Sequence, residues 1–133
     1  MDIREYPAYR EEEILRLYSA VGWSAYTNDP AALQKGFEQS LLVLAAYEND
    51  KLAGIIRVVG DGTTIVFVQD ILVFPEYQRK GIGTALLKEI LARYSHVRQV
   101  ELATDATPKT IAFYESVGFR KMSDMGCMGF MRA

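Results

Sequence analysis

Two glycines and two cationic residues lie close together near the middle of the chain, in the segment Gln78-Arg79-Lys80-Gly81-Ile82-Gly83-Thr84. This segment follows an apolar run and opens a helical pattern, whose first turn leaves N–H groups unpaired at the positive end of the helix dipole. Glycine lets backbone amides approach an anion closely, while Arg79 and Lys80 add positive charge and Thr84 a hydroxyl group. The segment predicts an anion site, although a bare Gly-x-Gly is equally typical of a tight turn.

The longer nucleotide-binding fingerprints are missing from this segment. It contains no Gly-x-x-x-x-Gly-Lys-[Ser/Thr] sequence, and it lacks the third glycine of a dinucleotide loop. If the loop binds an anion, we therefore expect an anion of another kind.

Hydrophobic periodicity locates the elements that must position this loop. One helix carries Ile14, Leu15 and Tyr18 on one face and ends near Gly22, and another begins at Asn28-Asp29-Pro30. Two more helices are expected, over 81–94 and from Thr107-Pro108 to Gly118. Strands are expected near 2–6, 41–47, 52–59, 64–73, 97–103, 119–123 and 127–132. This order predicts an α+β fold, in which an antiparallel meander continues into a parallel pair joined by a right-handed crossover.

Size and composition limit the classes of function. The 133 residues suit a single domain over 1–133, and a net charge of −2 gives no basic surface for nucleic acid. No apolar run reaches the roughly 20 residues of a membrane span, and the N-terminus does not resemble a signal peptide, so we expect a cytoplasmic protein. The only cysteine, Cys127, is expected to pack in a strand rather than to form a catalytic pair with His96, the only histidine.

Two ordered motifs give the sequence a family resemblance. Gln78 to Thr84 resembles the Gln/Arg-x-x-Gly-x-Gly/Ala signature of the GCN5-related N-acetyltransferase (GNAT) superfamily, and the preceding Asp70–Tyr77 resembles its cofactor-binding strand. Further along, Ile111–Phe119 resembles the later motif around Phe-Tyr-Glu-x-x-Gly-Phe. The resemblance implies a three-layer α/β/α fold with a mixed, mostly antiparallel central sheet and a splayed parallel strand pair.

The resemblance also implies acetyl-CoA as the donor, with coenzyme A as the product and no metal. The backbone of Ile71, Leu72 and Val73 would hold pantetheine. The pyrophosphate would meet the loop formed by Gln78, Arg79, Lys80, Gly81, Ile82, Gly83 and Thr84. Where the family often has a cofactor-contacting asparagine, this chain has Thr107, which also suits the role of a helix N-cap.

For the chemistry, the resemblance implies that Tyr114 protonates the departing thiolate. The base is less defined. The polar residues of the cofactor strand are Gln69 and Asp70, expected on opposite faces, and Asp70 is either the base or a structural acceptor. If Asp70 is not the base, a chain of water molecules would remove the amine proton, or the substrate would arrive as the neutral amine.

The acceptor side is expected around the first helices, with Trp23, Tyr26 and Arg57 as candidate contacts. The implied activity is acetyl transfer to a primary amine of a small molecule or peptide, by direct attack through a tetrahedral intermediate. The alternative is a non-catalytic acyl-CoA-binding module of the same fold. Neither nucleic acid nor membrane is expected as a partner, and monomer and homodimer both remain open.

Overall fold

The computed structural model describes all 133 residues, and the chain divides into two compact units, Met1–Glu101 and Leu102–Ala133. The strands are β1 (Asp2–Glu5), β2 (Leu42–Glu48), β3 (Lys51–Gly60), β4 (Ile65–Val73) and β5 (Gln99–Leu102). The helices are α1 (Glu11–Ala20), α2 (Ser24–Thr27), α3 (Pro30–Glu38), α4 (Ile82–Arg93) and α5 (Pro108–Ser116), with 3-10 helices η1 (Pro75–Tyr77) and η2 (Met122–Met125). None of the helices has the length and apolar character needed to cross a membrane.

The strands form one sheet in the order β1-β2-β3-β4-β5. Neighbours from β1 to β4 pair antiparallel, whereas β5 lies parallel to β4 after the crossover through α4. The predicted α+β fold with a mixed, mostly antiparallel sheet is thus confirmed.

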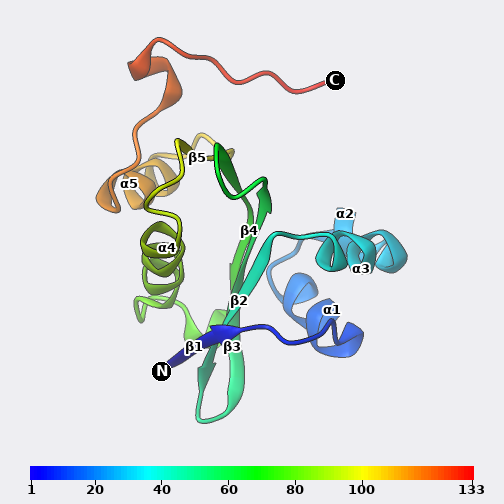
Figure 1. Cartoon of the computed structure of the whole chain (residues 1–133). Coiled ribbons are helices and arrows are strands. Elements are labelled where there is room, and N and C mark those ends of the chain that lie inside the picture. Colours follow the sequence, from blue (N-terminus) through cyan, green and yellow to red (C-terminus); the bar gives the residue numbers. More distant parts are fainter. The chain divides into compact units, whose positions relative to one another are not determined.

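Helices cover both faces of the sheet in the first unit, with α1, α2 and α3 on one side and α4 on the other (Figure 1). On the first side, Ile14 and Leu17 of α1 pack with Phe37 of α3 against Ile55 and Leu72 of the sheet. On the other side, α4 buries one stripe of its surface, formed by Ile82, Leu86, Leu87 and Ile90. Apolar burial on both faces holds the strand and the helix that flank the glycine loop.

Local capping signals located two helices correctly. Before α3, the Asp29 side chain accepts a hydrogen bond from the Ala32 N–H. Before α5, the Thr107 side chain accepts one from the Thr110 N–H. A proline follows each cap, where a missing N–H costs nothing. The sequence missed α2, because a four-residue helix is too short to show a hydrophobic period.

A β-bulge interrupts the pairing of β3 with β4. Arg57 pairs with Asp70 and Val58 with Val68, so Gln69 is an extra residue in β4. An extra residue breaks the alternation of side chains between the two faces. The expectation that Gln69 and Asp70 point to opposite faces is therefore wrong, since both side chains reach the Tyr26 hydroxyl.

The C-terminal segment also differs from expectation. The strands expected near 119–123 and 127–132 are absent: η2 covers the end of the first range, and residues 126–133 form no regular element. Cys127 is exposed instead of packed in a strand. A strand needs a neighbour for its backbone groups, and within Leu102–Ala133 no other strand pairs with these residues.

Candidate active site

The end of β4 leads directly into the glycine loop. Val73 pairs with Gly54 of β3, and a side chain on Gly54 would meet the Leu72 carbonyl oxygen at 2.5 Å. Glycine is therefore required at this position for the close approach of the two strands. After η1, the Gln78 side chain folds back and its Nε2 donates to the Val73 carbonyl at 3.0 Å. This hydrogen bond ties the start of the loop to the end of the strand.

The loop backbone is bent by two residues in the left-handed region. Arg79 has φ 64° and Gly81 has φ 80°. Glycine adopts this conformation without strain, whereas arginine does so at a cost. Left-handed residues next to right-handed ones turn successive N–H groups toward one concave side, which is an arrangement that binds anions.

The amides of this loop have no acceptor within the protein. No hydrogen bond is formed by the backbone N–H of any residue from Arg79 to Thr84, and the next amide, that of Ala85, donates to Gly81. No side chain caps α4, whereas α3 and α5 are capped by Asp29 and Thr107. The first turn of α4 also contains no acidic residue. Six adjacent donors at the positive end of a helix are thus free for an external anion.

Two cations complete the loop. Arg79 and Lys80 are exposed and take part in no ion pair, and the Lys80 ammonium lies 5.6 Å from the centre of the Tyr77 ring. Donors of this kind and number fit a pyrophosphate, one of the anionic groups of coenzyme A. Beside the loop, Leu72 is buried in the core while Ile71 and Val73 are half-buried.

Asp70 is the centre of a buried polar network. Its Oδ2 accepts from Arg57 Nε at 2.8 Å and from the Tyr18 hydroxyl at 2.7 Å, while its Oδ1 accepts from the Tyr26 hydroxyl at 3.0 Å. Asp70 is 1% exposed and Arg57 6% exposed. Burial and the neighbouring Asp70 carboxylate raise the pKa of Tyr18, so its hydroxyl remains a donor. A buried carboxylate with three donors satisfies the requirement that buried charge be paired.

Arg57 extends this network to the end of α3. Its Nη1 donates to the Gly36 carbonyl at 3.3 Å and to the Ser40 hydroxyl at 3.2 Å. The guanidinium also lies 5.5 Å from the centre of the Phe37 ring. Arg57 therefore joins three parts of the first unit: β3, β4 and the C-terminal end of α3.

Aromatic side chains form the solvent side of the network. Trp23 stacks on Tyr26 with ring centres 6.0 Å apart and is 37% exposed, and Tyr18 packs edge-on against both. Gln69 Nε2 donates to the Tyr26 hydroxyl at 3.1 Å. Tyr26 is half-buried, so its hydroxyl joins the buried carboxylate to the protein surface.

Tyr114 and Thr107 belong to the second unit. Tyr114 is half-buried, and its ring packs edge-on against Phe113 and Phe119. Burial, reinforced by the Asp105 carboxylate, raises the pKa of the Tyr114 phenol. The Thr107 hydroxyl accepts from the Thr110 N–H and donates to Asp105, which confirms its role as an N-cap.

The structure thus brings together three of the predicted site residues, Asp70, Arg57 and Tyr26, with Trp23 stacked beside them. Sequence reasoning did not foresee the contact of Gln69 with Tyr26. Two consecutive polar residues in an otherwise apolar strand were the available signal, since such a pair marks a place where alternation fails.

Comparison with known proteins agrees with this fold. The sequence model of the acetyltransferase (GNAT) domain matches residues 5–132, and the chain belongs to this family. A GNAT-family acetyltransferase from Streptococcus pneumoniae TIGR4 is 40% identical and superposes with a TM-score of 0.89, covering 99% of this chain and 96% of that one.

More distant relatives extend the comparison. An uncharacterized ycf52-like N-acetyltransferase of Prochlorococcus marinus is 28% identical over 80% of this chain, which spans only 61% of that relative's length. The PaiA N-acetyltransferase of Thermoplasma acidophilum, solved in complex with coenzyme A, has a TM-score of 0.72 at 17% identity, with 90% of this chain and 89% of that chain covered. At this identity the likeness concerns the fold alone.

Proposed function

We propose that this chain is an acetyl-CoA-dependent N-acetyltransferase that acts on a primary amine of a small molecule or peptide. The observation that carries the proposal is the run of six backbone amides without an acceptor, from Arg79 to Thr84, at the uncapped start of α4. Family membership and the coenzyme A complex of the Thermoplasma acidophilum protein support the choice of donor. The family match over 5–132 supports treating both units as parts of one acetyltransferase domain.

In this proposal the loop binds the donor and β4 orients it. The amides from Arg79 to Thr84 hold the pyrophosphate, with Gln78 fixing the loop to Val73. The backbone of Ile71, Leu72 and Val73 lies along pantetheine. The Thr107 hydroxyl is already engaged in capping α5, so any contact it makes with the cofactor is an additional hydrogen bond.

The donor supplies an acetyl group activated as a thioester. The amine nitrogen forms a bond to the acetyl carbon, and the backbone N–H of Val73 stabilises the developing oxyanion, since the N–H of Phe74 already donates to the Ala53 carbonyl at 2.8 Å. The C–S bond then breaks, and the thiolate takes the proton of the Tyr114 hydroxyl. A thiol has a pKa of about 8.5 and a phenol about 10, so this transfer requires Tyr114 to be placed against the sulfur as charge develops.

The proton on the attacking amine leaves through Tyr26. Asp70 is enclosed and already accepts three hydrogen bonds, so it meets no substrate directly. The Tyr26 oxygen accepts a proton from the amine while the Tyr26 hydroxyl proton passes to Asp70 along their 3.0 Å hydrogen bond. Trp23 forms the aromatic surface beside this position, and Arg57 holds Asp70 in place.

The enclosure of Asp70 is also the observation that favours the second candidate, a module that binds acyl-CoA without turnover. The two functions are separated by a screen of polyamines, amino acids, aminoglycosides and peptides that measures released thiol, combined with calorimetric titration of coenzyme A. Turnover of any amine supports the enzyme. Tight coenzyme A binding with no turnover favours the module, and absence of binding contradicts both.

A further inference from the structure

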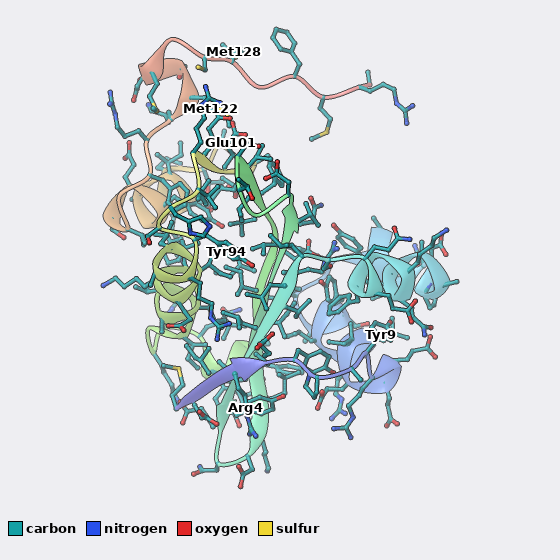
Figure 2. The ribbon with its side chains drawn as sticks, viewed as in Figure 1. Arg4, Tyr9, Tyr94, Glu101, Met122 and Met128 are labelled. Atoms are coloured by element: carbon teal, nitrogen blue, oxygen red, sulfur yellow. The ribbon has the colours of Figure 1, made fainter.

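Gln69 is the extra residue of β4 at the bulge, and it is the only exposed residue of that strand. The bulge brings its side chain to the Tyr26 hydroxyl, which Asp70 also contacts. The side chains on this face, Tyr9 among them, lie between the sheet and the helices α1, α2 and α3 (Figure 2). Gln69 therefore joins the buried network from its solvent side.

Three tyrosines on this face have hydroxyls with different partners. The Tyr9 hydroxyl has none, and the Tyr18 hydroxyl donates to Asp70 Oδ2 at 2.7 Å. The Tyr26 hydroxyl donates to Asp70 Oδ1 at 3.0 Å, and its oxygen also accepts from Gln69 Nε2 at 3.1 Å. Because a longer hydrogen bond is weaker, Asp70 holds the proton of Tyr26 less firmly than that of Tyr18. The orientation of the Tyr26 hydroxyl therefore depends on its second partner.

Donor and acceptor chemistry fixes how the Gln69 amide faces Tyr26. A carboxylate only accepts, so the single hydroxyl proton of Tyr26 points to Asp70. Toward Gln69 the phenol oxygen can then only accept, and the glutamine must present its NH₂ group. An N–H at this place keeps the Tyr26 proton from turning away from Asp70, since two hydrogens would then face each other. One lone pair of the Tyr26 oxygen remains for the acceptor amine.

We propose that Gln69 is a positioning residue for acetyl transfer, which holds the Tyr26 O–H toward Asp70 and leaves the Tyr26 oxygen open to the amine. This role rests on the proposed function, in which Tyr26 takes the amine proton and passes its own to Asp70. Gln69 takes up no proton itself, because a carboxamide is not a base at neutral pH. Without Gln69, the Tyr26 hydroxyl turns to water in part of the molecules, and those molecules cannot relay the proton.

Gln69→Met removes the amide at nearly constant side-chain size. With the primary amine of the screening panel that is turned over fastest, we expect kcat to fall about three- to tenfold at neutral pH, the factor of one neutral hydrogen bond, with the KM for acetyl-CoA unchanged. The fall should shrink at a pH where the amine arrives neutral, because no proton then needs the relay. Gln34→Met is the matched control: Gln34 is also exposed and donates to Glu38 at 3.3 Å, on α3. An unchanged kcat in Gln69→Met, or a fall that is equal at every pH, would overturn the role.

A double-mutant cycle with Tyr26→Phe separates this role from the proposed function. In the Tyr26→Phe chain Gln69 has no oxygen to donate to, so adding Gln69→Met should change kcat by less than about twofold. If Gln69→Met lowers kcat by the same factor in both backgrounds, Gln69 acts elsewhere and the inference fails while the relay stands. If Tyr26→Phe alone retains the wild-type kcat, or no amine of the panel is turned over, the relay itself fails and the role of Gln69 fails with it. Circular dichroism establishes that each variant is folded.

Discussion

Arg57 Nε donates to Asp70 Oδ2 at 2.8 Å, and the two side chains are almost completely closed to solvent. A pair of this kind contributes little net stability when intact, but loss of one charge leaves the other buried alone. Because Tyr18 and Tyr26 also donate to Asp70, the pair connects the sheet to α1 and α2, the side on which we place the acceptor amine.

Replacement of Asp70 tests this connection. In Asp70→Asn the buried Arg57 charge loses its partner, and we expect the free energy of unfolding to fall by about 3 kcal/mol, measured by urea denaturation. Asp29→Asn is the control, because Asp29 is a solvent-exposed N-cap and asparagine caps equally well, so little change is expected. A loss below about 1 kcal/mol in Asp70→Asn would contradict the structural importance of the pair.

Removal of the Tyr26 hydroxyl tests the proton path. We expect Tyr26→Phe to lower the acetylation rate by about 10–100-fold at neutral pH, with partial recovery at a pH where the amine arrives neutral. Tyr9→Phe is the control, since the Tyr9 hydroxyl has no hydrogen-bond partner. Equal rates in wild type and Tyr26→Phe across the pH range would exclude Tyr26 as the relay.

Tyr114 is expected to act on the leaving group. Tyr114→Phe should reduce kcat by about 10–100-fold and leave coenzyme A affinity near wild type. Burial and the Asp105 carboxylate raise the pKa of Tyr114, so its phenol stays protonated at neutral and mildly alkaline pH. Loss of that proton should therefore cause no fall in kcat from about pH 7 to 9. Tyr94→Phe, in the connection after α4, serves as the control. An unchanged kcat in Tyr114→Phe would remove Tyr114 from the mechanism.

Gly81 and Gly22 offer a matched pair for the loop. Both are left-handed, at φ 80° and 79°, and a Cβ on either would meet no atom within 4 Å. Alanine should therefore cost each site a similar 1–2 kcal/mol of backbone strain. Only Gly81→Ala disturbs the amides that face the pyrophosphate, so only this variant should weaken coenzyme A binding, measured by calorimetry. Equal affinities in the two variants would argue against the loop as the binding site.

The parts of the fold that the sequence predicted well depend on local signals. Asp29-Pro30 and Thr107-Pro108 mark helix starts by capping chemistry, and the period of four along Ile82, Leu86 and Ile90 identifies α4. The loop was predictable for the same reason, because glycines, cations and a helix start are adjacent in sequence.

The predictions that failed concern features that depend on residues far apart in the sequence. The bulge at Gln69 is defined by the register of β4 against β3, which no local pattern encodes. The buried network of Asp70 joins residues up to 52 positions apart in sequence. In each case a tertiary contact decided what the local sequence left open.

Amide hydrogen exchange at Arg79–Thr84 tests the central claim most directly. These six N–H groups have no acceptor in the protein, so they should exchange rapidly in the free chain and much more slowly with saturating coenzyme A. The amides of Gly22 and Gly126, at left-handed positions outside the loop, should be unaffected. Coenzyme A that binds while all six loop amides continue to exchange rapidly would contradict the account.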